Sequence, residues 1–206
     1  MDNKKYISII FDDGPREPMR EMIDKFIQHG YRCGFEIIGK KVNDSTEAVL
    51  IYAIDNGFEL VSHGQKHIGL PELEKSEMYT ELFSPINEIE HRLGYKIVTA
   101  RAPYLWADDK VFEICKEHNL PLLGQGITVA HDWEATVSSV EIADSFIENV
   151  YDGAIICLHV KPNTLDALDK IFEFLKKENY ELLTPTNLFV VKKLDPIPLD
   201  KQITRV

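Results

Sequence analysis

Short apolar runs alternate along the chain with longer segments in which apolar residues recur every three or four positions. The short runs are rich in β-branched and aromatic residues, which is typical of strands buried on both faces. The longer segments follow the period of a helix that buries one face. The first run, residues 7–11, ends at Gly14-Pro15, a pair that stops a strand and turns the chain. The pattern therefore predicts a regular alternation of strands and helices.

Turn and capping residues mark most ends of these elements. Strands are expected at residues 7–11, 33–38, 58–61, 97–100, 121–123 (extending towards 129), 154–160, 180–183 and 188–191. Helices are expected at residues 17–30, 45–56, 73–93, 108–119, 138–150 and 164–179. Pro85 lies inside the third of these helices, where a proline can break the helix.

Apolar strands that alternate with helices predict an α/β fold, with a parallel sheet inside and helices outside. About seven such units in this length fit a single-domain, distorted and incomplete (β/α) barrel, and a flat doubly wound sheet is the alternative. Neither the dinucleotide fingerprint nor the phosphate-loop pattern is present. Residues 1–193 are expected to form the domain. Residues 194–206, with two prolines and no helical period, are expected to form an extended tail, which could also serve a homo-oligomer.

Composition narrows the possible functions. The chain has 206 residues, of which 44% are hydrophobic, and this suits one domain with a full core. Its net charge of −11 argues against nucleic acid or an anionic membrane as a partner. Three scattered cysteines are too few for a disulfide framework or a cysteine-rich zinc site. No apolar leader precedes the first strand and no run could span a bilayer, so a cytoplasmic location is expected if Met1 is the native start.

Ionisable side chains gather at one end of the predicted strands. In parallel α/β folds, reactive groups collect at the carboxyl ends of the strands. Nearly every predicted strand is followed by such groups, which are Asp12 with Asp13, His63 with His67, Arg101, His131 with Asp132, and His159. This repeated placement predicts a reactive site at that edge of the sheet.

Asp13, His63 and His67 form a candidate metal set. The two histidines are four residues apart, which on a helical turn places both rings on one face. Two histidines and one carboxylate form the ligand set of a catalytic metal that keeps positions open for water. Similar ligands hold iron in oxygen-dependent enzymes, but nothing in the sequence suggests the accompanying 2-oxo-acid site. Because Asp12 and Asp13 point different ways on an extended chain, one can bind metal while the other acts on a water.

The remaining polar residues at the strand ends have two interpretations each. Arg101 is either a surface residue or a partner that holds a carboxylate ionised across the mouth of the fold. His159 is either a core histidine bonded to backbone or a general acid, with Asp132 to orient it and support its protonated form. Trp133 is either part of the core or a wall against a sugar face.

In this order and spacing, the residues resemble the NodB-type polysaccharide deacetylases, carbohydrate esterase family 4. Phe11-Asp12-Asp13-Gly14-Pro15 is similar to the family's first motif, residues 33–39 to its second strand, and His63 to His67 to its His-x-x-x-His motif. Arg101-Ala102-Pro103-Tyr104, Asp132-Trp133 and Leu158-His159 match the third, fourth and fifth motifs. The resemblance covers about residues 6–192.

The resemblance implies a hydrolase that removes N-acetyl groups from amino sugars in an oligo- or polysaccharide. It implies one divalent metal, with zinc as the first expectation and cobalt or nickel as alternatives. In the implied mechanism Asp13, His63 and His67 bind the metal, and Asp12, supported by Arg101, is the general base. The backbone N–H of Tyr104 stabilises the oxyanion, and His159, tuned by Asp132, protonates the leaving amine. Leu158 and Trp133 line the acyl pocket. These roles agree with the chemistry, because a metal activates water and polarises the amide, and an oxyanion needs fixed donors.

Two residues depart from the family pattern near the expected cleft. Gly64 stands where many members have Thr or Ser, and Leu105 stands where many have Gly. These departures concern the substrate and keep open an alternative, an allantoinase-like hydrolase of cyclic amides. A catalytically inactive glycan-binding member is a separate alternative, although every catalytic position is filled. A cytoplasmic member would act on a small oligosaccharide, a lipid-linked sugar or a nucleotide sugar rather than on assembled cell wall.

Overall fold

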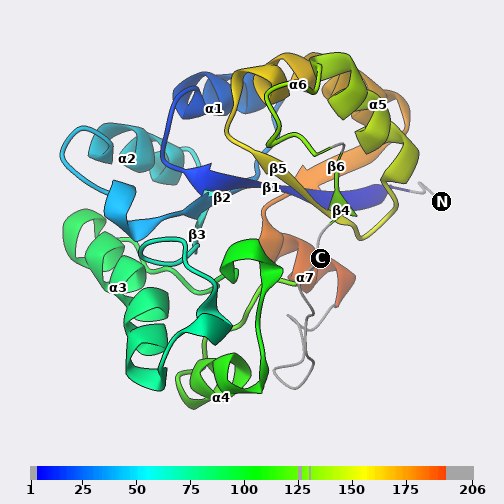
Figure 1. Ribbon diagram of the computed structural model, residues 1–206. Coiled ribbons are helices and arrows are strands. Elements are labelled where there is room, and N and C mark those ends of the chain that lie inside the picture. The colour runs from blue at the N-terminus through cyan, green and yellow to red at the C-terminus, as the bar shows by residue number, and fades with distance from the viewer. Residues whose placement is uncertain (1–3, 125–126, 130, 194–206) are drawn as a thin grey trace.

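The computed structural model describes residues 4–124, 127–129 and 131–193. Six parallel strands form one sheet with the order β3-β2-β1-β5-β4, and β6 also pairs with β1. The strands are β1 (Lys5–Gly14), β2 (Gly34–Ile37), β3 (Glu59–Ser62), β4 (Ile127–Thr128), β5 (Ile155–His159) and β6 (Tyr180–Leu183). Figure 1 shows β1 at the centre of this sheet. The sequence-based expectation of a parallel α/β fold is confirmed.

Strand β1 organises the sheet because it is long enough to pair with three others. Ser8 lies opposite both Ile155 of β5 and Leu183 of β6, so these two strands flank opposite sides of β1. Strand β2 pairs with the carboxyl half of β1, beyond the part that contacts β6. Ile7, Ile9 and the other core residues of β1 are completely buried, as its continuous apolar run predicts.

Two expected strands shrink to single bridges. Residues 97–100 and 121–123 contribute only the parallel bridges from Ser62 to Ala100 and from Ala100 to Leu122. These bridges extend the sheet beyond β3, as expected of an incomplete barrel. The strand expected at residues 188–191 is wrong, because those residues lie in helix α7 (Pro185–Lys192).

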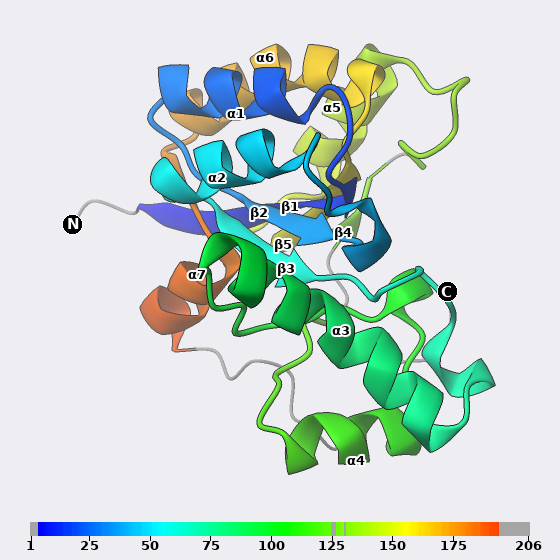
Figure 2. The ribbon, with the colours of Figure 1, turned by 90° about the vertical axis from the view of Figure 1, so that its left-hand side faces the viewer.

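Seven helices are described, and they lie on both faces of the sheet. They are α1 (Met19–Gln28), α2 (Glu47–Asp55), α3 (Lys75–Leu93), α4 (Asp109–Glu117), α5 (Ser139–Asn149), α6 (Pro162–Lys177) and α7 (Pro185–Lys192). Helices α1, α5 and α6 cover one face, with α2 beside α1, and α3, α4 and α7 lie on the other face (Figures 1 and 2). Within the described residues, no helix has the length and apolar content needed to cross a membrane.

Aromatic rings fill the main core between the sheet and the layer formed by α1, α5 and α6. The rings of Phe11 and Phe35, on neighbouring strands, stack with their centroids 5.5 Å apart. Phe26 of α1 meets Phe172 of α6 edge to face at 4.9 Å. A second cluster of buried residues lies under α3 and α4. The sheet is thus packed against apolar residues on both faces.

Pro85 does not break α3, contrary to what a proline inside a helix suggests. The boundary expected at residue 193 is not tested, since the tail at 194–206 lies outside the described residues.

Candidate active site

Strand register brings the predicted residues to one edge of the sheet. Asp12 of β1 lies directly opposite His159, the last residue of β5. His63 follows the last residue of β3, and Arg101 follows Ala100, which bridges to that same residue. Because the strands are parallel, these four side chains share the carboxyl edge.

Asp13, His63 and His67 converge on one point. Their ligand atoms all lie within 4.8 Å of one another. The Nε2 atoms of the two histidines are 3.1 Å apart, and Nε2 of His67 lies 3.7 Å from Oδ1 of Asp13. Asp13 and His67 both have left-handed backbone, with φ of 68° and 62°, a conformation that is uncommon outside glycine and concentrates at functional sites.

This cluster fits a divalent cation. Ligands about 2.1 Å from a tetrahedral zinc lie about 3.4 Å from each other, close to the separations found here. His63 donates its Nδ1–H to the carbonyl oxygen of Arg101 over 3.0 Å, so its Nε2 carries the lone pair that faces His67. Burial lowers the pKa of His63 to about 4, and burial also lowers the pKa of His67. Both rings are therefore neutral near pH 7, as metal ligation requires.

A second group of potential ligands fits a cation poorly. Asp12, Glu36 and His63 also lie within 4.8 Å of one another. However, the Nδ1 atom of His63 is used as a donor to backbone, and the Arg101 guanidinium lies against the same group. A fixed positive charge at this position disfavours a cation.

The segment that carries the two histidines is not a helical turn, contrary to expectation. Residues 63–69 form an irregular loop between β3 and the short 3-10 helix η2 (Leu70–Glu72). Gly64 has a φ of 77°, and an added Cβ would lie 2.9 Å from Oε1 of Glu81. The structure therefore gives Gly64, a departure from the family pattern, a physical reason.

Helix α3 holds this loop through Glu81. Oε1 of the buried Glu81 accepts the backbone N–H groups of Lys66 at 2.6 Å and Ile68 at 3.3 Å. The backbone oxygen of Glu81 accepts the N–H of Gln65. Pro85 stands four residues later and has no N–H for that oxygen, so the carbonyl is available to the loop. The proline thus couples the helix to the loop.

Asp12 is held as a carboxylate. It is almost fully buried, and its Oδ2 lies 4.0 Å from Nε2 of His63. Burial alone would raise the pKa of Asp12, but the positive charge of Arg101, followed by the contribution of His63, outweighs it and holds the pKa well below its usual range. Oδ1 of Asp12 is a buried acceptor that has no hydrogen-bond partner within the described chain.

Glu36 is a site residue that sequence reasoning missed. It lies within β2 and is completely buried. Its Oε2 is 3.1 Å from Nδ1 of His63 and its Oε1 is 3.4 Å from Nε of Arg101. Burial, and next to it the Asp12 carboxylate, raises the pKa of Glu36 well above its usual range. An acidic residue inside an apolar strand was the signal that could have revealed it.

His159 is paired with Asp132 as predicted. Nδ1 of His159 lies 2.8 Å from Oδ1 of Asp132, and its backbone N–H donates to Oδ2 of the same carboxylate. Thr164 also donates its hydroxyl to Asp132. Burial alone would lower the pKa of His159, but its hydrogen bond to Asp132 outweighs this and raises the pKa. The ring of Trp133 lies 5.7 Å from that of His159.

Tyr104 and Leu158, the other predicted substrate contacts, lie in a short helix beside His67 and in the main core, respectively. Tyr104 lies in the short 3-10 helix η3 (Pro103–Leu105), and its ring centroid is 4.6 Å from that of His67. Leu105 has a φ of 54°, which is strained for a leucine and easy for a glycine. Leu158 is fully buried in the main core, so its place in an acyl pocket stays a prediction.

The sequence matches a known family over more than half of its length. The model of the polysaccharide deacetylase family matches residues 1–123. The chain belongs to the polysaccharide deacetylase family. This confirms the resemblance inferred from the order of the motifs.

The sequence similarity to known deacetylases extends over nearly the whole chain. A bifunctional xylanase/deacetylase from Pseudobutyrivibrio xylanivorans is 27% identical over 94% of this chain, and the match covers 32% of that protein. The peptidoglycan-N-acetylmuramic acid deacetylase PdaC of Bacillus subtilis is 26% identical over 93% of this chain and 40% of that protein. The chain thus spans about a third to two fifths of the length of these relatives.

Solved structures of family members share the whole fold. The Xyl-CE4 domain of a multidomain xylanase from the hindgut metagenome of Trinervitermes trinervoides has a TM-score of 0.90 at 26% identity, and 98% of each chain is covered. A family 4 acetyl xylan esterase from Clostridium thermocellum, solved in complex with a cobalt ion, has a TM-score of 0.88 at 29% identity with the same coverage.

Proposed function

We propose that this chain is a hydrolase that uses a divalent metal to remove N-acetyl groups from amino sugars in an oligo- or polysaccharide. The observation that carries the proposal is that the Asp13–His63–His67 cluster lies at the same edge of the sheet as an ionised buried carboxylate, Asp12, and a carboxylate-paired histidine, His159. A cation, a base and an acid within one edge of the sheet are the parts that amide hydrolysis requires.

Asp13, His63 and His67 would hold the cation, for which we propose zinc, with cobalt or nickel able to replace it. When bound, such an ion lowers the pKa of water and polarises the amide carbonyl. The donor set of two imidazoles and one carboxylate leaves positions for water and substrate. The cobalt ion in the family 4 esterase supports a divalent metal at this site.

Asp12 would act as the general base. Its lowered pKa keeps it ionised across the neutral range, and its Oδ1 is available to accept a proton from the attacking water. The positive charge of the buried Arg101 stabilises the ionised form of Asp12, so the base stays unprotonated.

His159 would act as the general acid. Asp132 holds Nδ1, which leaves Nε2 as the atom that can donate to the leaving amine. The raised pKa of His159 increases the fraction that carries the required proton near neutral pH. Tyr104 would contribute its backbone N–H to the oxyanion, and Trp133 and Leu158 would border the acyl group.

The curated relatives support the substrate class. Their names specify deacetylation of peptidoglycan amino sugars, and one combines xylanase and deacetylase activity. An N-acetylated sugar chain is therefore the substrate proposed for this domain.

Two measurements on the same preparations test the proposal. Acetate release is assayed on N-acetylglucosamine oligomers after chelated protein is reloaded with zinc or cobalt, and metal binding is measured by calorimetry. We expect one tight site and acetate release in the wild type, loss of both in His63→Ala, and retained binding without turnover in Asp12→Asn.

Contrary outcomes would be equally informative. Absence of metal binding by the wild type would overturn the metal-dependent mechanism. Full activity in Asp12→Asn would rule out the assigned base. Ring opening of allantoin without acetate release from any sugar would favour the cyclic-amide alternative, and sugar binding without any product would favour a binding-only domain.

A further inference from the structure

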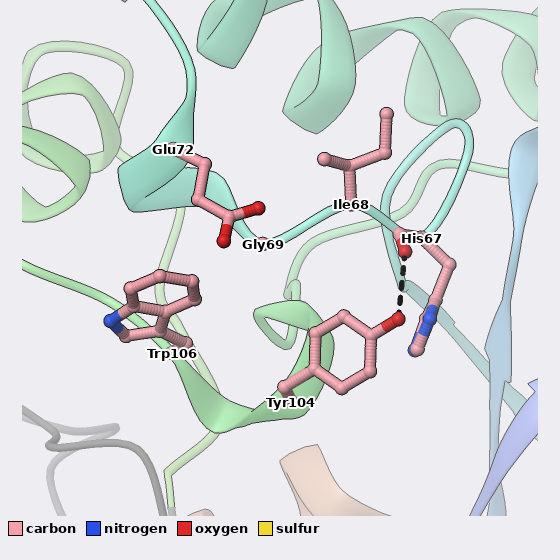
Figure 3. A pocket seen from close by; sticks show the side chains of 6 residues that line it. All are labelled: His67, Ile68, Gly69, Glu72, Tyr104 and Trp106. Atoms are coloured by element: carbon pink, nitrogen blue, oxygen red, sulfur yellow. Dashed lines mark hydrogen bonds between the residues drawn. The ribbon is translucent and has the colours of Figure 1, made fainter.

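A pocket of about 300 Å³ opens beside the proposed metal ligands. It is lined by His67, Ile68, Gly69, Glu72, Tyr104 and Trp106, as Figure 3 shows. His67 belongs both to the pocket and to the cation cluster, where its Nε2 faces His63. A molecule in this pocket therefore lies next to the reacting centre. The volume is at the small end for ligand sites and suits one sugar ring.

Two short 3-10 helices shape the pocket from opposite sides. Helix η2 supplies Glu72 and helix η3 supplies Tyr104, whose hydroxyl donates to the backbone oxygen of His67 over 3.4 Å. Trp106 packs closely against Gly69, because a Cβ at that glycine would lie 2.6 Å from the indole. Gly69 is therefore required for the indole to occupy its present position beside the pocket.

The lining has the chemistry of a sugar site with a negative charge. In Figure 3 the Tyr104 and Trp106 rings border the space, and the Glu72 carboxylate points into it. Aromatic rings offer apolar surface to the C–H groups of a sugar, and a carboxylate accepts hydrogen bonds from hydroxyl or ammonium groups. No lysine or arginine is among the described residues that line the pocket. The charge of Glu72, in a chain of net charge −11, thus attracts a cationic sugar and repels an acidic one.

We propose that this pocket is a subsite for one hexosamine unit beside the unit being deacetylated, and that Glu72 makes it favour a unit with a free amino group over one with a carboxylate. The inference rests on the proposed function, since deacetylation itself produces free amino groups along the chain. Selectivity of this kind would direct the enzyme to chains that are already partly deacetylated and away from those with N-acetylmuramic acid at this position.

The test compares three tetrasaccharides in low salt. They are an all-N-acetylglucosamine chain, the same chain with one free amino group at an internal unit, and a peptidoglycan chain that contains N-acetylmuramic acid. Acetate release gives kcat and KM for the wild type, Glu72→Gln and Trp106→Ala. Glu113→Gln, which removes an exposed glutamate of α4, is the matched control.

We expect the wild-type KM to rise from the amino chain to the neutral chain to the acidic chain. In Glu72→Gln, KM should increase about threefold for the amino chain and decrease about threefold for the acidic chain, the scale of one solvent-accessible charge contact. The neutral chain and all kcat values should change less than twofold, and added salt should reduce the wild-type differences. Trp106→Ala should raise KM for all three chains about tenfold, with partial recovery in Trp106→Phe.

Failure of this inference can be distinguished from failure of the proposed function. If the wild type releases acetate but Glu72→Gln has the same ratios of KM among the three chains, the proposed subsite is overturned while the proposed function stands. If no chain releases acetate, calorimetric binding of a glucosamine tetramer still tests the pocket. Equal affinity of that tetramer for wild type and Glu72→Gln would then overturn it, and weaker binding to the variant would support it.

Discussion

At the residue scale, the buried Glu36 is the least expected feature of the site. Its carboxyl group lies between Nδ1 of His63 and Nε of Arg101, without water-exposed surface. Its pKa is raised, first by burial and then by the charge of Asp12, so the folded protein favours the protonated acid. Burial of this group therefore costs stability above the ordinary glutamate pKa.

Glu36→Gln keeps the shape of the side chain and removes this cost. Relative to the wild type, the free energy of unfolding of Glu36→Gln should rise by about 1.4 kcal/mol per pH unit above about pH 4.3, until the folded-state pKa is reached. The two proteins should be similar below that pH. Urea unfolding with chelator between pH 4 and 8 measures the difference, and a difference independent of pH would contradict a raised pKa. Glu59→Gln, at a buried glutamate bonded to Thr186, is the control.

The Asp132–His159 pair makes a second prediction at this scale. The hydrogen bond to the Asp132 carboxylate is the main contribution that raises the pKa of His159 against burial, so loss of this carboxylate should lower that pKa. A general acid must be protonated, so activity declines as pH rises through its pKa. In Asp132→Asn the alkaline limb of the kcat profile should move to lower pH, with lower maximal activity. Glu134→Gln, which alters only the neighbouring exposed pair with His131, should keep the wild-type profile.

The sequence revealed Asp12, His63 and His159 but not Glu36, and the difference has a physical reason. Asp12, His63 and His159 follow apolar runs, and strand ends in parallel sheets are where such groups become functional. Glu36 lies inside a strand, where alternation turns Phe35 towards the aromatic core and Glu36 towards the opposite side. Its proximity to His63 depends on the register between β2 and β3, which the sequence of one strand does not contain.

At the element scale, α3 supports the loop of residues 63–69, which carries His63 and His67. Glu81 binds two N–H groups of the loop through its side chain and a third through its backbone oxygen. Sequence periodicity predicted the helix and flagged Pro85 as a break. The contact between the two segments explains why the proline is tolerated, and periodicity within the helix could not reveal that contact. Likewise, the apolar run at 188–191 resembles a strand, but Pro185 begins helix α7, which leaves Val190 largely exposed.

Weakening this support should weaken cation binding without removing a ligand. Glu81→Ala leaves the N–H groups of Lys66 and Ile68 without their acceptor. Each of these groups that stays buried should lower the free energy of unfolding by about 1–3 kcal/mol. Zinc affinity by calorimetry should fall about tenfold, the effect typical of groups that position ligands. Glu88→Ala, on the same helix but paired with Arg92, should lower neither affinity nor stability to this extent. Unchanged zinc affinity in Glu81→Ala would show that the loop keeps its shape unaided.

At the scale of the whole molecule, the proposed cation site joins two parts of the sheet that do not pair directly. Asp13 belongs to β1, while His63 and His67 follow β3, and β2 separates the two strands. The motifs predicted that these residues meet, but the strand order that brings them together is a property of the complete fold. A bound cation would therefore stabilise the folded state against unfolding as a whole, because the unfolded chain cannot hold the three ligands together.

This linkage predicts a metal-dependent melting temperature. Zinc at about 100 times its Kd adds about 2.7 kcal/mol of stability, which for a chain of this size raises Tm by about 5–10 °C over chelated protein. His67→Ala should lose most of this shift, whereas His118→Ala, at an exposed histidine after α4, should keep it. Magnesium, which prefers oxygen ligands, should produce little change in either protein. An equal zinc shift in His67→Ala and the wild type would mean that zinc stabilises the fold from another site, and the Asp13–His63–His67 centre would then lose its thermodynamic support.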